Sequence, residues 1–240
     1  MISNSTIKYI RSLHQKKNID QSNVFLLEGE KNIEEVLNSN LVIREIFGTK
    51  NWFNKLKFSL SNEIKTSVVT KKELLKISGL KTPNKVIGIV EKVSNSLDYN
   101  VLKNGIFLVL DSINNPGNLG TIIRIADWFG ITTIICSNNS VKYHNSKVLQ
   151  SSMGSFTRVN VYNVDLKDFV GVCKKKSIPL FGTFLEGNSI YKVSFPNNFG
   201  LVIFSFRNKT PNNIAKIIEV SLNAITTAIG AFENAYIIKE

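Results

Sequence analysis

The stretch Asn114–Gly130, NNPGNLGTIIRIADWFG, constrains the fold of this chain more than any other segment. It follows an unbroken apolar run, Ile106–Leu110, which is typical of a buried strand. The turn-forming cluster NNPG comes next, and apolar residues then recur at helical spacing. The pattern predicts a helix that begins near Asn118, with Asn118 as its N-cap, and ends at Gly130.

The polar residues of this expected helix indicate a ligand site. Gly120, Arg124 and Asp127 fall on the face opposite the apolar residues. An asparagine-rich loop at the carboxyl end of a strand, followed by a helix with an outward arginine, is where an open α/β sheet places a ligand. The simpler alternative is a turn and a helix whose arginine is only a solvated surface residue. The stretch is not a dinucleotide fingerprint, because G-x-G-x-x-G is absent.

Length and composition set broad limits on the class of protein. The 240 residues allow one large or two modest domains, and 43% hydrophobic residues are enough for a packed core. No run approaches the roughly 18 apolar residues of a membrane span, and the N-terminal segment lacks the apolar centre of a secretion signal. We therefore expect a cytoplasmic protein without membrane contact, in which Cys136 and Cys173 stay reduced. His14 and His144 are isolated, so no metal site is expected.

The charge balance points weakly to a polyanionic partner. The net charge is +12, with a pI of about 9.6, and RNA or DNA is the simplest partner for such a surplus. The chain is also rich in Lys, Asn and Ile, a bias that an AT-rich genome produces without any selection for binding. The charge alone therefore does not establish nucleic-acid binding.

Residues 1–95 are predicted to form a small α/β unit, because strand-like and helix-like segments alternate there. The expected strands are Val24–Leu27, Val42–Phe47, Lys65–Val69 and Val86–Val90, and the expected helices are Ile7–Leu13, Ile33–Leu37 and Glu73–Ile77, with a short helix or turn at Trp52–Leu56. Residues 96–104 are polar and lack periodicity, which indicates a linker.

Residues 105–240 continue the alternation as a second α/β domain. After the opening strand and helix, the expected strands are Thr132–Cys136, Pro179–Thr183 and Leu201–Ile203, and the expected helices are Lys147–Gln150, Asp165–Lys176 and a closing helix that carries Leu222 and Tyr236 on one face.

Three parts of the chain resemble the SpoU (TrmH-like) branch of the SPOUT methyltransferases. The residues that resemble the family's motif I are Asn115, Pro116, Asn118, Gly120, Arg124 and Gly130. The segments YIRSLHQKKN, FLLEGEKNIEEVL and LLKISGLKTPNKVIGIV are similar, in order, to the substrate-binding domain that precedes many SpoU catalytic domains. Near the C-terminus, Ser221, Leu222 and Asn223 resemble the family's last motif.

The resemblance implies an enzyme that transfers a methyl group from S-adenosylmethionine to a ribose 2′-hydroxyl of rRNA or tRNA. It implies a small N-terminal α/β substrate-binding domain in residues 1–95, then a SPOUT-type α/β (trefoil-knot) domain in residues 105–240, and a cytoplasmic homodimer. The residues that it implies are Asn118, Arg124, Ser221 and Asn223 for catalysis, Thr183, Leu185, Phe204 and Leu222 for cofactor binding, and Arg11, Lys16, Lys17 and Asn115 for RNA binding.

Arginine is a poor general base, because its pKa exceeds about 12. We therefore interpret Arg124 first as a clamp on a phosphate or on the 2′-oxygen, and only second as the base that the family's mechanism proposes.

One segment departs from the family pattern. Phe204 and Phe206 stand where the family has a glycine and a glutamate beside the cofactor, and the segment from there to Ser221 is shorter than in the family. A phenylalanine ring where a backbone must approach a ligand is a steric obstacle, and the shortening puts the knot in doubt. An alternative is therefore an RNA-binding protein of the same family with a decayed cofactor pocket. A third is a basic globular protein with neither activity.

Overall fold

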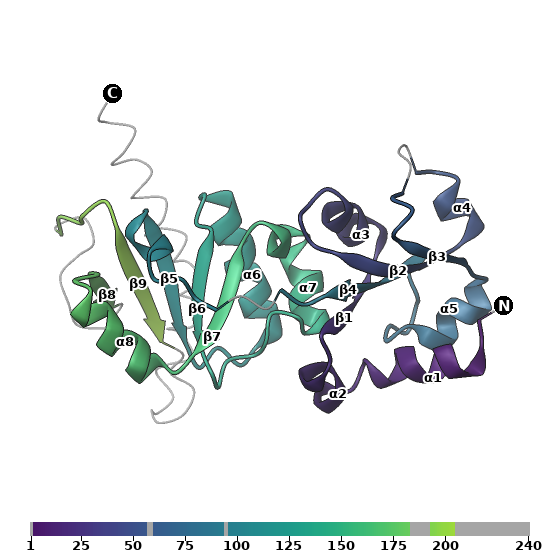
Figure 1. The fold of residues 1–240 in the computed structure, drawn as a ribbon, viewed down its shortest axis with the longest axis horizontal. Helices are drawn as coiled ribbons and strands as arrows, with labels where there is room; N and C mark the ends of the chain where they lie inside the picture. The colour runs from purple at the N-terminus through teal and green to yellow at the C-terminus, as the bar shows by residue number, and fades with distance from the viewer. Residues whose placement is uncertain (1, 57–59, 94–95, 183–192, 205–240) are drawn as a thin grey trace. The chain divides into compact units, whose positions relative to one another are not determined.

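The computed structural model describes residues 2–56, 60–93, 96–182 and 193–204 (Figure 1). Contacts divide the chain into two units, Met1–Ser94 and Asn95–Glu240. Both units are α/β, as the sequence predicts, and each is built around its own sheet.

The first unit has a mixed four-stranded sheet of order β1-β4-β2-β3. Strand β4 is antiparallel to β1 and β2, whereas β3 is parallel to β2. The elements, in chain order, are α1 (Asn4–Ser12), α2 (Lys16–Gln21), β1 (Val24–Glu28), α3 (Glu30–Leu37), β2 (Ile43–Gly48), α4 (Lys50–Phe53), β3 (Lys65–Val68), α5 (Lys71–Ile77) and β4 (Val86–Glu91).

Helices cover both faces of this sheet. Ile10 of α1 and Leu74 of α5 share one apolar cluster with Leu26 of β1, so both helices pack on the same face. Helix α3 packs on the other face, because a Cβ on Gly88 would lie 2.6 Å from Cδ1 of Ile33. Successive strand residues point to opposite faces, which explains why β1 is buried along its whole length.

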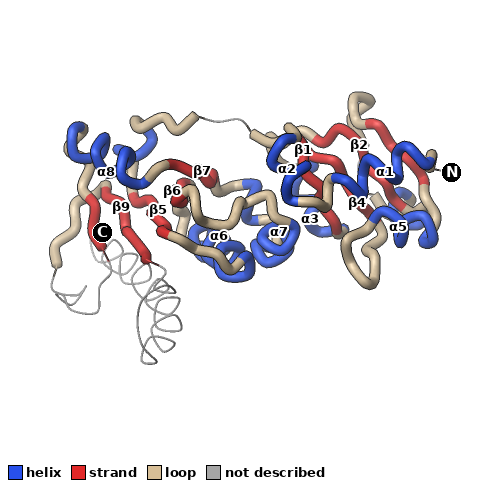
Figure 2. The backbone as a smooth tube through the Cα atoms, turned by 90° about the horizontal axis from the view of Figure 1, so that it is seen from below, coloured by secondary structure: helices blue, strands red, loops and turns tan. Residues whose placement is uncertain are grey.

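The second unit has a five-stranded sheet of order β7-β6-β5-β9-β8 in which all neighbours are parallel. Its elements are η1 (Val101–Lys103), β5 (Ile106–Asp111), α6 (Pro116–Trp128), β6 (Thr133–Ser137), α7 (Ser146–Ser152), η2 (Ser155–Thr157), β7 (Asn160–Val164), α8 (Leu166–Lys175), β8 (Leu180–Gly182) and β9 (Phe199–Phe204). Helices α6 and α7 lie side by side on one face, and α8 lies on the other (Figure 2). Parallel strands that helices cover on both faces have continuous apolar sequences. This pattern is why the strands of this sheet can be predicted from the sequence.

The segment 96–104 packs onto the second unit. Leu102 of η1 is buried, and Leu97 and Tyr99 pack against the cluster formed by Phe107 and Phe169.

Gly120 corrects one expectation from the sequence. It does not face outward but is buried where α6 crosses α7. A Cβ on Gly120 would lie 1.9 Å from Oγ of Ser151 and 2.7 Å from the backbone oxygen of Val148. The glycine therefore allows the two helices to approach closely, and a backbone atom forms one wall of the contact.

The substitution Gly120→Ala is expected to lower the free energy of unfolding by about 1–3 kcal/mol, because the Val148 carbonyl cannot rotate away as a side chain could. Urea denaturation would measure the change. Gly171→Ala in α8 is the matched control: a Cβ there meets nothing within 4 Å, so it should stabilise by about 0.5–1 kcal/mol. Equal stability of the two variants would contradict the close helix contact.

Candidate active site

The strand order of the second unit indicates where a ligand would bind. From β5 the chain runs to β6 and then β7, whereas β9 and β8 lie on the other side of β5. Such a reversal is a topological switch point, and open α/β sheets bind ligands outside the carboxyl ends of the strands that flank it. Those ends are Asp111 of β5 and Phe204 of β9, which are register partners.

The loop that leaves β5 at the switch point is held by two buried serines. Oγ of Ser137 accepts a hydrogen bond from the Ser112 amide at 2.8 Å, and Oγ of Ser140 accepts one from the Ile113 amide at 3.1 Å. The two hydroxyls also contact each other at 3.0 Å. Ser112 has a positive φ of 56°, a conformation that such fixed contacts can maintain. Neither serine is among the site residues that the sequence predicts.

The loop ends at an asparagine that caps α6, and here the structure shows that the sequence-based prediction of the N-cap is wrong. The N-cap of α6 is Asn115, whose Oδ1 accepts from the amides of Gly117 at 2.8 Å and Asn118 at 3.3 Å. Pro116 takes the first helical position, where its missing N–H costs nothing. Asn118 therefore lies inside the first turn and is not the cap. The cap occupies the Asn115 oxygen, so a contact from Asn115 to RNA would use its amide nitrogen.

Arg124 lies further along α6 and is exposed. Among the residues that the structure describes, it makes no hydrogen bond or ion pair, so its guanidinium is available to an external anion. It follows Asn118 by six positions, which is about 9 Å along the helix axis and about 120° around it. The structure thus brings Asn115 and Asn118 together, and it places Arg124 on another side of the same helix.

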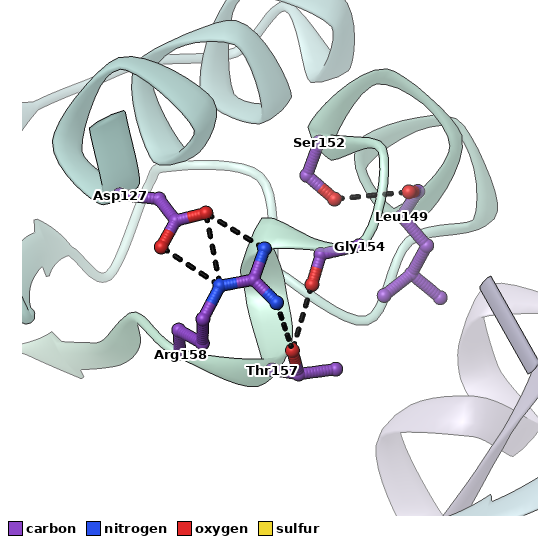
Figure 3. Close-up of polar contacts among 6 residues, drawn as sticks. All are labelled: Asp127, Leu149, Ser152, Gly154, Thr157 and Arg158. Carbon is purple, nitrogen blue, oxygen red and sulfur yellow. Dashed lines mark hydrogen bonds and ion pairs between the residues drawn. The ribbon is translucent and has the colours of Figure 1, made fainter. Parts of the chain in front are cut away.

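The end of α6 is anchored by an ion pair. Arg158 donates from Nε to Oδ1 of Asp127 at 2.9 Å and from Nη2 to Oδ2 at 2.8 Å (Figure 3). Nη1 of Arg158 also reaches Thr157, whose hydroxyl donates to the Gly154 carbonyl oxygen. Burial acts to raise the pKa of the Asp127 carboxyl, but hydrogen bonds from Arg158 and Ser155 and the Arg158 charge outweigh it, so this pKa is lowered from 3.8.

Because the folded pKa of Asp127 is lowered, its stabilising effect is present above about pH 4 and is lost as the pH falls through the folded value. Asp127→Asn should therefore cost about 1 kcal/mol at pH 7, a modest figure because Arg158 is half exposed. The difference from the parent should shrink below pH 4 in thermal melts. Glu91→Gln, which breaks the exposed pair with Arg44, is the control and should have a smaller effect. A pH-independent loss in Asp127→Asn would refute the ion-pair account.

The remaining candidate residues fall into three groups. Arg11, Lys16 and Lys17 are exposed on the first unit. Thr183, Leu185, Phe206, Ser221, Leu222 and Asn223 lie outside the described residues, as do the closing helix and any knot. For Phe204 the structure describes the strand position only.

Neither cysteine is placed for nucleophilic chemistry. Burial raises the pKa of Cys136 to about 12 and that of Cys173 to about 11, so both thiols stay protonated near neutral pH. Within the described residues, no group of three or more His, Cys, Asp or Glu side chains could hold a metal ion. No helix in that part of the chain is both long enough and apolar enough to cross a membrane.

The described backbone at the switch point fits a nucleoside cofactor. Strands β8 and β9 are parallel neighbours, so their last residues, Gly182 and Phe204, lie at the same edge of the sheet. Gly182 is exposed there and presents no side chain to an approaching ligand. Thr183, Leu185 and Leu222, which the sequence predicts to contact the cofactor, belong to the segments outside the described ranges.

Comparisons with known proteins agree with this geometry. The SpoU rRNA Methylase family matches residues 105–224, and the MRM3-like substrate binding domain matches residues 4–88. The chain is 26% identical over 205 residues to 23S rRNA (guanosine(2553)-2′-O)-methyltransferase RlmP of Bacillus subtilis (strain 168), a match that covers 83% of this chain and 79% of the relative. It is 29% identical over 164 residues to mitochondrial rRNA methyltransferase 3 of Xenopus laevis, which covers 64% of this chain but 38% of that protein.

Solved structures give the same result for the fold. A TrmH-family protein from Porphyromonas gingivalis superposes with a TM-score of 0.83 at 26% identity, covering 96% of this chain and 97% of the other. The SpoU methyltransferase AviRb from Streptomyces viridochromogenes, solved in complex with AdoMet, superposes with a TM-score of 0.74 over 95% and 96% of the two chains. At 18% identity, the second likeness shows the fold alone. The resemblance found in the sequence is confirmed, since one family profile spans half of the chain: this protein belongs to the SpoU rRNA Methylase family.

Proposed function

We propose that this protein methylates a ribose 2′-hydroxyl in ribosomal RNA, with its reaction centre at the switch point between β5 and β9. The observation that carries the proposal is the placement of Asn115 and Asn118 directly after β5, where an open α/β sheet binds its ligand. The protein is an S-adenosylmethionine-dependent RNA 2′-O-methyltransferase. The preference for ribosomal over transfer RNA rests on the names of its relatives.

The chemistry requires positioning more than a strong base. S-adenosylmethionine, when bound, supplies an electrophilic methyl group on a positively charged sulfur. The 2′-oxygen of the ribose must be held in line with that methyl group, and its proton must leave in or near the transition state. In this proposal Arg124 clamps a phosphate or the 2′-oxygen with its planar fork of donors. Asn118 hydrogen-bonds the ribose, and Asn115 adds a contact to the RNA.

The other site roles extend the proposal into segments outside the described ranges. Ser221 and Asn223 would orient the reacting groups, and Thr183, Leu185, Phe204 and Leu222 would surround the cofactor. Residues 1–95 would be the RNA substrate-binding domain, joined by residues 96–104 to a catalytic domain in residues 105–240.

We further propose that the protein acts as a cytoplasmic homodimer. Arg124 and Asn118 lie on different sides of α6, about 120° apart around its axis. One ribose cannot readily contact both residues from a single subunit, so this separation favours a site that a second copy completes.

Methyl transfer can be measured directly. The purified protein is incubated with radiolabelled S-adenosylmethionine and either ribosomal or transfer RNA, and label in the RNA is counted. Alkaline hydrolysis then maps the site, because a methylated 2′-oxygen cannot attack the adjacent phosphodiester bond. We expect label in ribosomal RNA at a ribose.

The second candidate function is RNA binding without methyl transfer. Phe204 and Phe206, in place of the small and acidic residues of the family pattern, favour it. RNA binding in the absence of any label transfer, at millimolar cofactor, would support this candidate over the enzyme.

A further inference from the structure

Helices α1 and α5 form one continuous outer face of the first unit. At their N-terminal ends, the Ile2 amide donates a hydrogen bond to Oε1 of Glu73 at 2.9 Å. Near their C-terminal ends, Nε2 of His14 donates to the Ile77 carbonyl oxygen at 2.8 Å. Contacts at both ends show that the two helices run parallel and side by side, as Figures 1 and 2 also show. Side chains on either helix can therefore contact one ligand.

This face, the adjoining helix α2 and the segment after α5 carry a dense set of exposed cations. They are Lys8, Arg11, Lys16, Lys17, Lys71, Lys72, Lys76 and Lys81. In the described part of the chain, none of them forms an ion pair with a carboxylate. Glu73, the acid of α5, is already engaged by its capping box with Thr70 and by Ile2. We call this set the α1/α5 cation face.

The opposite face of the same sheet has a different charge. Helix α3 carries Glu30, Glu34 and Glu35 against a single Lys31. A genome-wide bias toward lysine codons would add lysine to both faces. On the α3 face Lys85 pairs with Glu30, whereas the acids next to the cation face, on α1, α2 and α5, are only Asp20 of α2 and Glu73 of α5 among the described residues. A lysine bias does not explain why eight cations there lack a carboxylate partner in the described part of the chain. The segregation is therefore evidence for a polyanionic partner on the α1/α5 side.

We propose that the α1/α5 cation face binds the phosphate backbone of the RNA substrate, and that Lys71, Lys72 and Lys76 of α5 are essential members of it. Within the first unit, the resemblance to the family assigns RNA contacts only near Arg11, Lys16 and Lys17. The structure adds α5, which is remote in sequence but adjacent to α1. Tyr9, half exposed on α1 at 48%, adds a ring on which an unpaired base can stack. The inference rests on the proposed function for the identity of the partner as RNA.

The test compares two triple variants of the full chain. The first, Lys71→Gln/Lys72→Gln/Lys76→Gln, removes three cations from α5. The second, Lys31→Gln/Lys50→Gln/Lys55→Gln, removes three exposed cations from α3, α4 and the turn after α4. Both lower the net charge equally and both are confined to the first unit. Binding to a labelled fragment of bacterial 23S rRNA is titrated between 50 and 200 mM salt, and thermal melts check that both variants are folded.

The α5 variant should bind RNA roughly tenfold or more weakly at low salt. Its plot of log affinity against log salt should be shallower by about 2–3, since each lost phosphate contact removes about 0.7–0.9 from the slope. The control variant should keep the slope of the parent. Lys16→Glu/Lys17→Glu serves as a positive control and should weaken binding as well.

Other outcomes would overturn the inference. Equal weakening by both triple variants would mean that only net charge matters, and an unchanged slope in the α5 variant would remove α5 from the surface. Loss of binding to vesicles that contain phosphatidylserine, with RNA binding intact, would assign the face to a membrane instead. Methyl transfer is measured separately: if the parent transfers no label but the α5 variant still loses RNA affinity, the proposed enzyme activity fails while this inference stands.

Discussion

Arg124→Ala is expected to abolish measurable methyl transfer, which is a loss of at least about 10²–10³-fold for one electrostatic donor. The side chain is exposed, and within the described residues it has no partner, so its removal should leave the fold and the melting temperature unchanged. Alanine also preserves the helix, because it has the highest helix propensity. The measurement is the initial rate of label transfer to ribosomal RNA at saturating cofactor, beside a melting curve for each variant.

Two further variants make this result specific. Arg124→Lys keeps the charge but loses the planar fork, so it should restore little activity. Thr121→Ala removes another exposed side chain from α6, one whose hydroxyl bonds only to its own helix at Gly117. It should retain nearly full activity. Full activity in Arg124→Ala would remove this residue from the site, whatever the other variants show.

The fold could be predicted because its strongest signals are local. The run Ile106–Leu110 is apolar without alternation, as a parallel strand covered on both faces must be, and the structure has β5 at Ile106–Asp111. The helix after it is recognisable from periodicity and ends as expected, with Gly130 at a φ of +69°. Even so, the order of the strands, and with it the switch point, depends on pairings between distant segments.

Two predictions for α6 are wrong. The N-cap is misplaced because two asparagines compete for that position, and Gly120 is misplaced because a second helix packs against it. Asn115 and Asn118 are both good caps by residue type, and Pro116 decides between them because it suits the first helical position. Gly120 falls on the polar arc of a helical wheel, yet α7 packs against the helix at this position. A helical wheel cannot show that a second helix, starting at Ser146, returns to pack there.

The loop before Asn115 and the end of α6 are held in place by contacts between residues that belong to no sequence motif. Ser137 and Ser140 hold the loop before Asn115, and Arg158 holds Asp127 from a turn 31 positions away. A sequence signal existed only for the first pair: two serines in a polar turn directly after a strand. Without an indication that β6 lies beside β5, nothing in the sequence connects them to the loop.

The second large effect is expected for cofactor affinity. Phe204 ends β9 beside Asp111, at the edge where the cofactor is expected to bind. Phe206 follows two positions later in the sequence, outside the described residues. The sequence-based prediction is that the two rings act together, because residues two apart on an extended segment share a face. If both rings enter the pocket, S-adenosylmethionine should bind in the millimolar rather than the micromolar range, a loss of about 4 kcal/mol.

Two effects of the phenylalanines are expected to weaken cofactor binding, and their free-energy costs add. A family glycine allows the backbone to approach the ligand, whereas a ring at the same position excludes it. Each backbone hydrogen bond to the cofactor that is lost costs about 1 kcal/mol, and more when the group is left buried without a partner. Removing the rings in Phe204→Gly/Phe206→Gly should therefore tighten binding tenfold or more, provided that melting curves show a folded chain.

Calorimetry at millimolar S-adenosylmethionine decides between the two states of this pocket. Weak binding that the double glycine variant tightens would mean that the rings obstruct an otherwise intact site, and slow methyl transfer would then accompany it. Saturable binding in the low micromolar range by the parent chain would mean that the strand end turns both rings away from the cofactor. That result would refute the obstruction of the pocket by the rings. The activity of Arg124→Ala could then be measured with the cofactor site saturated, so a loss of methyl transfer would report a defect in binding or positioning the RNA.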